Sequence, residues 1–386
     1  MAEANLALNL EQVFRENEKL DEVRRSSEAL LKQASQNGDS TLRVLGLCKA
    51  AQADLMDPAH GSRIAALEKV REAKALAEEH LLAEGAAVVK YSAARIHAKD
   101  GGEDGLDQAL DLCFQAVDAF HKLGQRRAEA SSMLMLGDIH GLLQQQDAAM
   151  RHYKEALAIF KEVGDHSFCG CTRHKLSKAY MMKGQFLRAA PAAQRAIDSY
   201  KAAGQNDQAQ GDCWITLAEA QSQAADIPKV QESIAQARTI FADIQDVASE
   251  AKAMGVLVKA YMQNDSPAEA VDVAKQVVTR FREAGDHHGE CQALLSLAKL
   301  LLPLDPEKAE RIASAAMDLM RGLGMSNQLE ECKDVKARCD HAKAAAEVEA
   351  KIWKRSDFMH VPRSLIVDPG CRGRLQNEFL EFAKAA

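Results

Sequence analysis

The chain has 386 residues, 47% of them apolar but only 5% aromatic, and a formal charge of −7. This mild negative charge argues against nucleic acid as a partner, and no apolar run is long enough to predict a membrane span. The acidic first residues resemble neither a signal nor a transit peptide, and nine cysteines without framework spacing suit a reducing compartment. We therefore expect a cytoplasmic protein.

The chain opens with apolar residues spaced three or four positions apart. This spacing predicts one amphipathic helix that caps the N-terminal end of the fold, within residues 1–38. Its apolar stripe comprises Leu10, Val13, Leu20, Val23, Leu30 and Ala34, with Asn17 and Ser27 at the intervening positions.

An aromatic residue followed four positions later by glycine then recurs about every forty residues. Full copies start at Phe120, Phe160, Tyr200 and Phe281, and weaker or partial copies end at Gly38, Gly85, Gln245 and Gly324. A fixed period of this length predicts a solenoid of helical repeats, over residues 39–324. We expect the glycine to end the second helix of each unit. The first two units are degenerate, and a glycine-rich stretch over residues 100–105 interrupts the second as an insertion.

The unit from 125 to 164 shows the expected pair of helices. Leu136 marks the apolar stripe of the first helix, and Asp147 is a candidate N-cap for the second. Small residues at Ala149 and Ala156 let the two helices approach closely. We expect Tyr153 and Phe160 to fill the space between neighbouring units. The equivalents of Leu136 in the later units are Leu176, Leu217, Leu257 and Leu297.

These residues carry a resemblance to a known family. The Leu136-Gly137 pair, the alanine twelve residues later, Tyr153 and Ala156 resemble the tetratricopeptide repeat. The forty-residue unit is similar to the repeats of kinesin light chains and of Leu-Gly-Asn-repeat scaffold proteins. The resemblance is clear over 125–324 and loose over 39–124, and it leaves the subfamily open because the residue after the key leucine is glycine only at 137. It implies an all-α, right-handed superhelical solenoid of about seven helix-turn-helix repeats.

The C-terminal end has a different character. A charged, alanine-rich segment within 325–355 predicts a second capping helix. Residues 356–386 predict an extended tail with a short terminal helix, because Pro362 and Pro369 interrupt it. The tail is net positive and contains apolar side chains. It packs on the repeats, occupies their groove as an internal ligand, or serves as a docking peptide.

The resemblance also implies a binding groove lined by the first helix of each unit. The residue two positions after the key leucine should face this groove, together with neighbours one turn further on. The candidate groove residues are Asp138, Lys178, Met181, Met182, Glu219, Lys259, Met262 and Lys299. Lysine at three of the five equivalent positions and methionine beside two of them predict an acidic, partly apolar peptide ligand. The alternative is that the lysines are merely solvated and the methionines merely pack.

Four residues have the composition of a zinc cluster. They are His166, Cys169, Cys171 and His174, but on a helix the two cysteines lie about 200° apart, so we interpret them as ordinary helix residues. No nucleotide-binding or hydrolase motif is present, and we expect no metal, no cofactor and no enzymatic activity. The predicted function is a scaffold or adaptor that binds a peptide or helix of a partner protein. The alternative is a non-catalytic regulatory subunit of an enzyme or motor complex, and the oligomeric state stays open.

Overall fold

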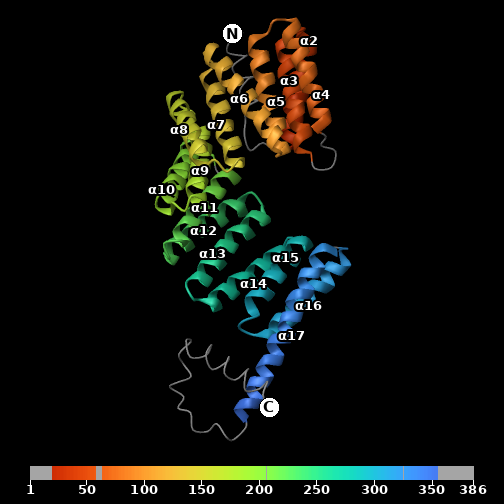
Figure 1. Ribbon diagram of the computed structural model, residues 1–386, viewed down its shortest axis with the longest axis vertical. Coiled ribbons are helices and arrows are strands. Elements are labelled where there is room, and N and C mark those ends of the chain that lie inside the picture. The colour runs from red at the N-terminus through yellow and green to blue at the C-terminus, as the bar shows by residue number, and fades with distance from the viewer. Residues whose placement is uncertain (1–19, 58–62, 206, 325, 355–386) are drawn as a thin grey trace. The chain divides into compact units, whose positions relative to one another are not determined.

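The computed structural model describes residues 20–57, 63–205, 207–324 and 326–354. All regular elements within these ranges are α-helices (Figure 1). In chain order the helices are α2 (Leu20–Asn37), α3 (Ser40–Met56), α4 (Arg63–Glu79), α5 (Ala83–Asp100), α6 (Glu103–Lys122), α7 (Arg126–Leu142), α8 (Gln146–Glu162), α9 (His166–Met182), α10 (Phe186–Ala202), α11 (Gln208–Ser222), α12 (Ile227–Asp243), α13 (Val247–Gln263), α14 (Pro267–Glu283), α15 (His287–Leu301), α16 (Pro306–Gly322) and α17 (Ser326–Lys354).

The helices follow one another as helix-turn-helix pairs, which confirms the predicted all-α repeat solenoid. Seven such pairs run from α3–α4 to α15–α16. The chain divides into two compact units, residues 1–273 and residues 274–386, and the division falls inside α14. From α2 to α13 each helix contacts the next helix along the chain. In the second unit α15 contacts α16, and α16 contacts α17.

The structure describes part of each predicted end. The helix α2 buries Val23, Leu30 and Ala34 of the predicted apolar stripe, whereas Leu10 and Val13 lie outside the described residues. The predicted C-terminal helix corresponds to α17. The expected tail, residues 356–386, also lies outside the described residues.

Residues with positive φ mark the turns that separate the units, and one turn differs from the prediction. The backbone there is in the left-handed conformation at Gly124, Gly164, Gly204, Gln245 and Gly285. Gly85, in contrast, lies inside α5 and marks no turn. The left-handed residue of that turn is Leu81, with φ 50°.

The glycine-rich stretch over 100–105 is not an insertion. The helix α5 ends at Asp100 and α6 begins at Glu103, so the stretch contains the tight turn of a helical hairpin. Gly101 is the left-handed C-cap of α5. The second repeat, α5–α6, is therefore a complete helix pair.

Aspartate side chains cap several helices, but not at every predicted place. The Asp165, Asp246 and Asp305 side chains each accept a hydrogen bond from a backbone N–H in the first turn of their helix. Asp147 does not cap α8, because α8 begins one residue earlier, at Gln146. The Asp147 carboxylate instead forms an ion pair with Lys183.

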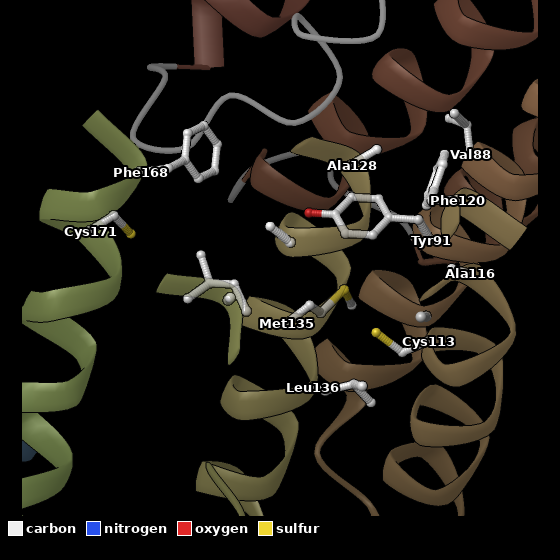
Figure 2. Packing of buried hydrophobic residues seen from close by; sticks show 14 of the residues in the cluster. Val88, Tyr91, Cys113, Ala116, Phe120, Ala128, Met135, Leu136, Phe168 and Cys171 are labelled. Carbon is white, nitrogen blue, oxygen red and sulfur yellow. The ribbon is translucent and has the colours of Figure 1, made fainter. Parts of the chain in front are cut away.

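The core is built from apolar side chains that pack between successive helices. Figure 2 shows this packing around α5, α6, α7 and α9. The fully buried Phe160 ring stacks on Phe168 of the next unit, with ring centroids 4.8 Å apart. Phe160 therefore fills the space between units, as predicted.

Tyr153 has a different place from the one predicted. Its ring packs so closely on Gly137 of α7 that a Cβ atom added there would lie 2.4 Å from the Tyr153 Cε1. The Tyr153 hydroxyl donates a hydrogen bond of 2.9 Å to Asp138, also on α7. Tyr153 thus holds its own hairpin together, because the absence of a side chain at Gly137 makes room for the ring.

Candidate functional site

Within residues 1–273, the predicted binding residues lie on the first helices of successive repeats. These helices are α7, α9, α11 and α13, and α11 contacts both α9 and α13 (Figure 1). The key leucines Leu136, Leu176 and Leu217 are buried on α7, α9 and α11. A residue two positions further on is rotated by about 200° around the helix axis and so faces away from the buried leucine. This rule selects one residue per helix, and we call the set the charged row: Asp138, Lys178, Glu219 and Lys259.

Asp138 is already engaged within the fold. Its carboxylate is half-buried and accepts hydrogen bonds from the Tyr153 hydroxyl and from Lys175 Nζ, both at 2.9 Å. The second contact joins α7 to α9. The negative charge of Asp138 is therefore balanced by a neighbouring helix of the same unit.

The other three members of the charged row lack such a partner. Lys178 and Lys259 are exposed and Glu219 is partly exposed. None of the three forms a side-chain ion pair or hydrogen bond with any residue that the structure describes. The row therefore presents a positive, a negative and a positive charge on three successive helices.

A charged pair beside this row shows that the same helices can satisfy their charges internally. Asp212 on α11 lies 3.8 Å from the ammonium group of Lys252 on α13. The unpaired state of Lys178, Glu219 and Lys259 is thus a property of their positions and not of the whole face.

A buried histidine shows how closely these helices approach one another. His174 on α9 makes a 2.9 Å hydrogen-bonding contact through Nε2 with the Thr216 hydroxyl on α11. Burial, together with the ammonium groups of Lys178, Lys175 and Lys252, lowers the pKa of His174 to about 3. Charges from α9 and α13 therefore both act on a side chain that links α9 to α11.

Exposed apolar side chains lie about one helical turn beyond the charged row. Met182 is 69% exposed and Met262 is 39% exposed, while Met181 is half-buried. The equivalent residue on α7, Leu142, is also exposed, as is Gln223, which directly follows α11. We call these residues the second row: Leu142, Met182, Gln223 and Met262.

Lys299 stands apart from the other predicted residues. It lies on α15, in the compact part formed by residues 274–386, whereas Lys178 and Lys259 lie in the part formed by residues 1–273. Its ammonium group forms an ion pair of 2.6 Å with Glu331 of α17. The structure therefore does not join Lys299 to the charged row.

The four residues with the composition of a zinc cluster have separate surroundings. Cys169 and Cys171 are buried and His166 is exposed, while His174 contacts Thr216. Burial raises the pKa of the Cys169 thiol. Over the described ranges, no three histidine, cysteine or acidic side chains gather as a metal site would require, and no helix has the length and apolarity needed to cross a membrane.

The structure also reveals a set of buried carboxylates that the sequence analysis missed. Glu129, Glu250 and Glu290 occupy the same position on α7, α13 and α15, and each is at most 6% exposed. Each pairs with a basic residue from the preceding helix: His121, Arg238 and Arg282, respectively. Each of these glutamates is the fourth residue of its helix. This regular position in the sequence could have revealed them. Each pair links one repeat to the next, and the paired charges are not available to a ligand.

Comparisons with known proteins agree with this architecture. A family model described as tetratricopeptide repeat matches residues 130–163. No curated protein matches the sequence significantly.

Three solved structures illustrate the similarity. A signal transduction ATPase with a tetratricopeptide repeat sensor from Pyrococcus horikoshii matches 81% of this chain at 17% identity and a TM-score of 0.61. The match covers 46% of that protein, so the chain spans less than half of its length. A Rap protein complexed with Competence and Sporulation Factor matches 89% of this chain and 98% of its own, at 12% identity and a TM-score of 0.51. Repeats of a putative kinesin light chain from Podosopora anserina match 51% of this chain and 95% of their own, at 19% identity and a TM-score of 0.44.

Proposed function

We propose that this chain of tetratricopeptide-type repeats is a protein-binding scaffold or adaptor. It holds a segment of a partner protein on the exposed face of α9, α11 and α13. The observation that carries the proposal is the charged row, in which Lys178, Glu219 and Lys259 occupy one position on three successive helices and lack a partner among the described residues. A partner segment can supply the missing counter-charges.

The rigidity of the repeats favours such binding. Each helix of the face is held by contacts with its neighbours, and α9 and α11 also by a buried leucine, so little ordering cost remains when a partner arrives. The exposed Met182 and Met262 add adaptable apolar contact area beside the charges. Charge placement then supplies specificity, and the methionines supply affinity.

The known relatives in fold support a binding role without specifying the partner. The similar Rap protein was solved in complex with its Competence and Sporulation Factor. The repeat fold is in general an interaction scaffold, so we propose a non-catalytic role for this chain. The buried cysteines Cys48, Cys113, Cys213 and Cys291 are free thiols, which fits the cytoplasmic location that we also propose.

Capture of partners from cells that express the chain tests the proposal. The wild-type protein is compared with a face variant that carries Lys178→Glu, Glu219→Lys and Lys259→Glu. A matched control carries Lys154→Glu, Lys161→Glu and Glu232→Lys, which make the same changes in charge at exposed positions on the second helices α8 and α12. We expect a partner that wild type and control retain and that the face variant loses.

The variants must first prove to be folded. Circular dichroism and melting temperature should agree among the three proteins, because all the substituted side chains are at least partly exposed. Equal capture of the same partners by wild type and face variant would contradict the proposal. Loss of those partners from the control as well would show that net charge, and not the face, determines binding.

A further inference from the structure

The order of charges on the exposed face specifies the kind of partner segment that fits it. Lys178, Glu219 and Lys259 alternate in sign, so a uniformly acidic ligand would meet a repulsive carboxylate in the middle of the row. This alternation adds a basic position to the acidic peptide that the lysines alone suggest. A complementary segment must present an acidic, a basic and an acidic side chain in that order.

The spacing of the helices sets the spacing of those charges. Packed helices lie about 8–10 Å apart, and α11 contacts both α9 and α13. An extended chain in the polyproline II conformation advances about 3.1 Å per residue with three residues per turn, so residues three apart lie about 9 Å apart on the same side of the chain. Neighbouring charges of an extended ligand therefore fall three residues apart.

The width of the face favours an extended ligand over a helical one. The second row lies about one helical turn from the charged row, a distance of about 5.4 Å. The backbone of an extended chain covers a narrower strip than a helix, which with its side chains measures about 10–12 Å across. An extended chain can contact both the charges and the exposed Met182 and Met262 within this strip.

The surroundings of the row show that its charges act across helices. Burial raises the pKa of the Cys213 thiol on α11, and the ammonium group of Lys178 on α9 partly opposes this effect. The positive charge of Lys178 is thus felt on the neighbouring helix that carries Glu219. A ligand side chain placed between them would experience both groups.

We propose that the partner is an extended segment with the pattern acidic-x-x-basic-x-x-acidic, with apolar residues at some intervening positions. Its acidic residues pair with Lys178 and Lys259, and its basic residue pairs with Glu219. Its apolar side chains contact Met182 and Met262. This inference rests on the proposed binding function and adds the chemistry of the bound segment.

Selection from a random library of fifteen-residue peptides tests the pattern. The full chain is the bait, in parallel with the face variant in which all three charges are reversed. We expect wild type to enrich the pattern acidic-x-x-basic-x-x-acidic and the face variant to enrich basic-x-x-acidic-x-x-basic. The control variant with changes on α8 and α12 should select the same peptides as wild type.

Synthetic peptides then give the size of the effect. For wild type, the peptide with reversed signs should bind at least about tenfold more weakly than the selected one, because three attractive contacts become repulsive. For the face variant the preference should invert. Added salt should weaken the binding of the selected peptide to wild type, since exposed charges are screened.

The remaining outcomes contradict the inference. Enrichment with no charge order, charges seven residues apart as a helix would place them, an unchanged preference in the face variant, or no enrichment at all would each overturn it. The proposed function has a separate test, because capture of the cellular partner depends on the face whatever the pattern of its ligand. If capture requires the face but the selected peptides lack this pattern, the proposed function stands and the inference falls.

Discussion

At the scale of single residues, close packing between helices depends on positions that lack a side chain. Gly137 faces the ring of Tyr153 at a distance that leaves no room for a Cβ atom. Gly170 and Gly211 receive the aromatic rings of Tyr200 and Phe241 in the following two units. In these three hairpins an aromatic ring of the second helix is therefore matched by a glycine on the first helix.

This match predicts that Gly137→Ala destabilises the protein although alanine is the better helix former. Alanine in place of glycine inside a helix gains up to about 1 kcal/mol. The new methyl group would lie 2.4 Å from the Tyr153 ring, and such overpacking costs about 1–3 kcal/mol. Urea unfolding should show a net loss of stability.

A second glycine supplies the control for this prediction. Gly255 lies inside α13, and a Cβ atom added there meets nothing within 4 Å. We therefore expect Gly255→Ala to be neutral or stabilising. Equal effects of the two substitutions would show that the contact with Tyr153 does not limit the packing.

At the scale of the elements, the link between α9 and α11 makes stability depend on pH. Burial and three nearby lysines hold the pKa of His174 near 3, below its ordinary value of 6.5. The folded state therefore binds fewer protons than the unfolded chain. The stability that neutral His174 contributes is complete above about pH 6.5 and is lost as the pH falls toward 3. At pH 5 the loss should be about 2 kcal/mol, at about 1.4 kcal/mol per pH unit.

Unfolding by urea at pH 7.5 and pH 5.0 measures this loss. His174→Asn should reduce the difference between the two values of stability, because asparagine does not titrate. His166→Asn is the control, since His166 is exposed on the same helix and should leave the difference unchanged. If both variants kept the full difference, His174 would not be its source.

The sequence predicts the left-handed residue correctly in most turns between repeats but not in all of them. Most glycines that end a repeat unit were predicted correctly, because left-handed backbone favours glycine strongly. Leu81 was missed because it adopts this conformation, at φ 50°, without being glycine. Backbone bonds compensate there, since the Leu82 N–H donates to the Ala77 carbonyl oxygen at 2.8 Å.

At the scale of the whole molecule, the repeat period predicted the all-helical architecture and the number of helix pairs. It did not predict the division within α14, because the spacing of the repeats continues through it. Which residues of the first helices face outward was predictable, since the key leucines lie buried on α7, α9 and α11. Which charges stay free was not predictable, because the partners of Asp138 and Lys299 come from other helices.

Contacts between successive helices also predict how damage spreads through the first unit. Phe160 is fully buried and stacks on Phe168 of the next repeat, so Phe160→Ala should cost about 3–5 kcal/mol. In an array in which each repeat contacts its neighbours, the loss should loosen α7–α10 first. Hydrogen exchange should show lowered protection there, with α2–α4 protected nearly as in wild type.

Phe114→Ala serves as the control for Phe160→Ala, because Phe114 is 49% exposed on α6. Truncating a half-exposed ring removes less apolar surface from the core, so this variant should lose less stability and keep its exchange pattern. The prediction depends on where protection is lost and not only on how much. A uniform loss from α2 to α13 in the Phe160 variant would mean that the first unit unfolds as one cooperative body, and the nearest-neighbour account of its stability would then be wrong.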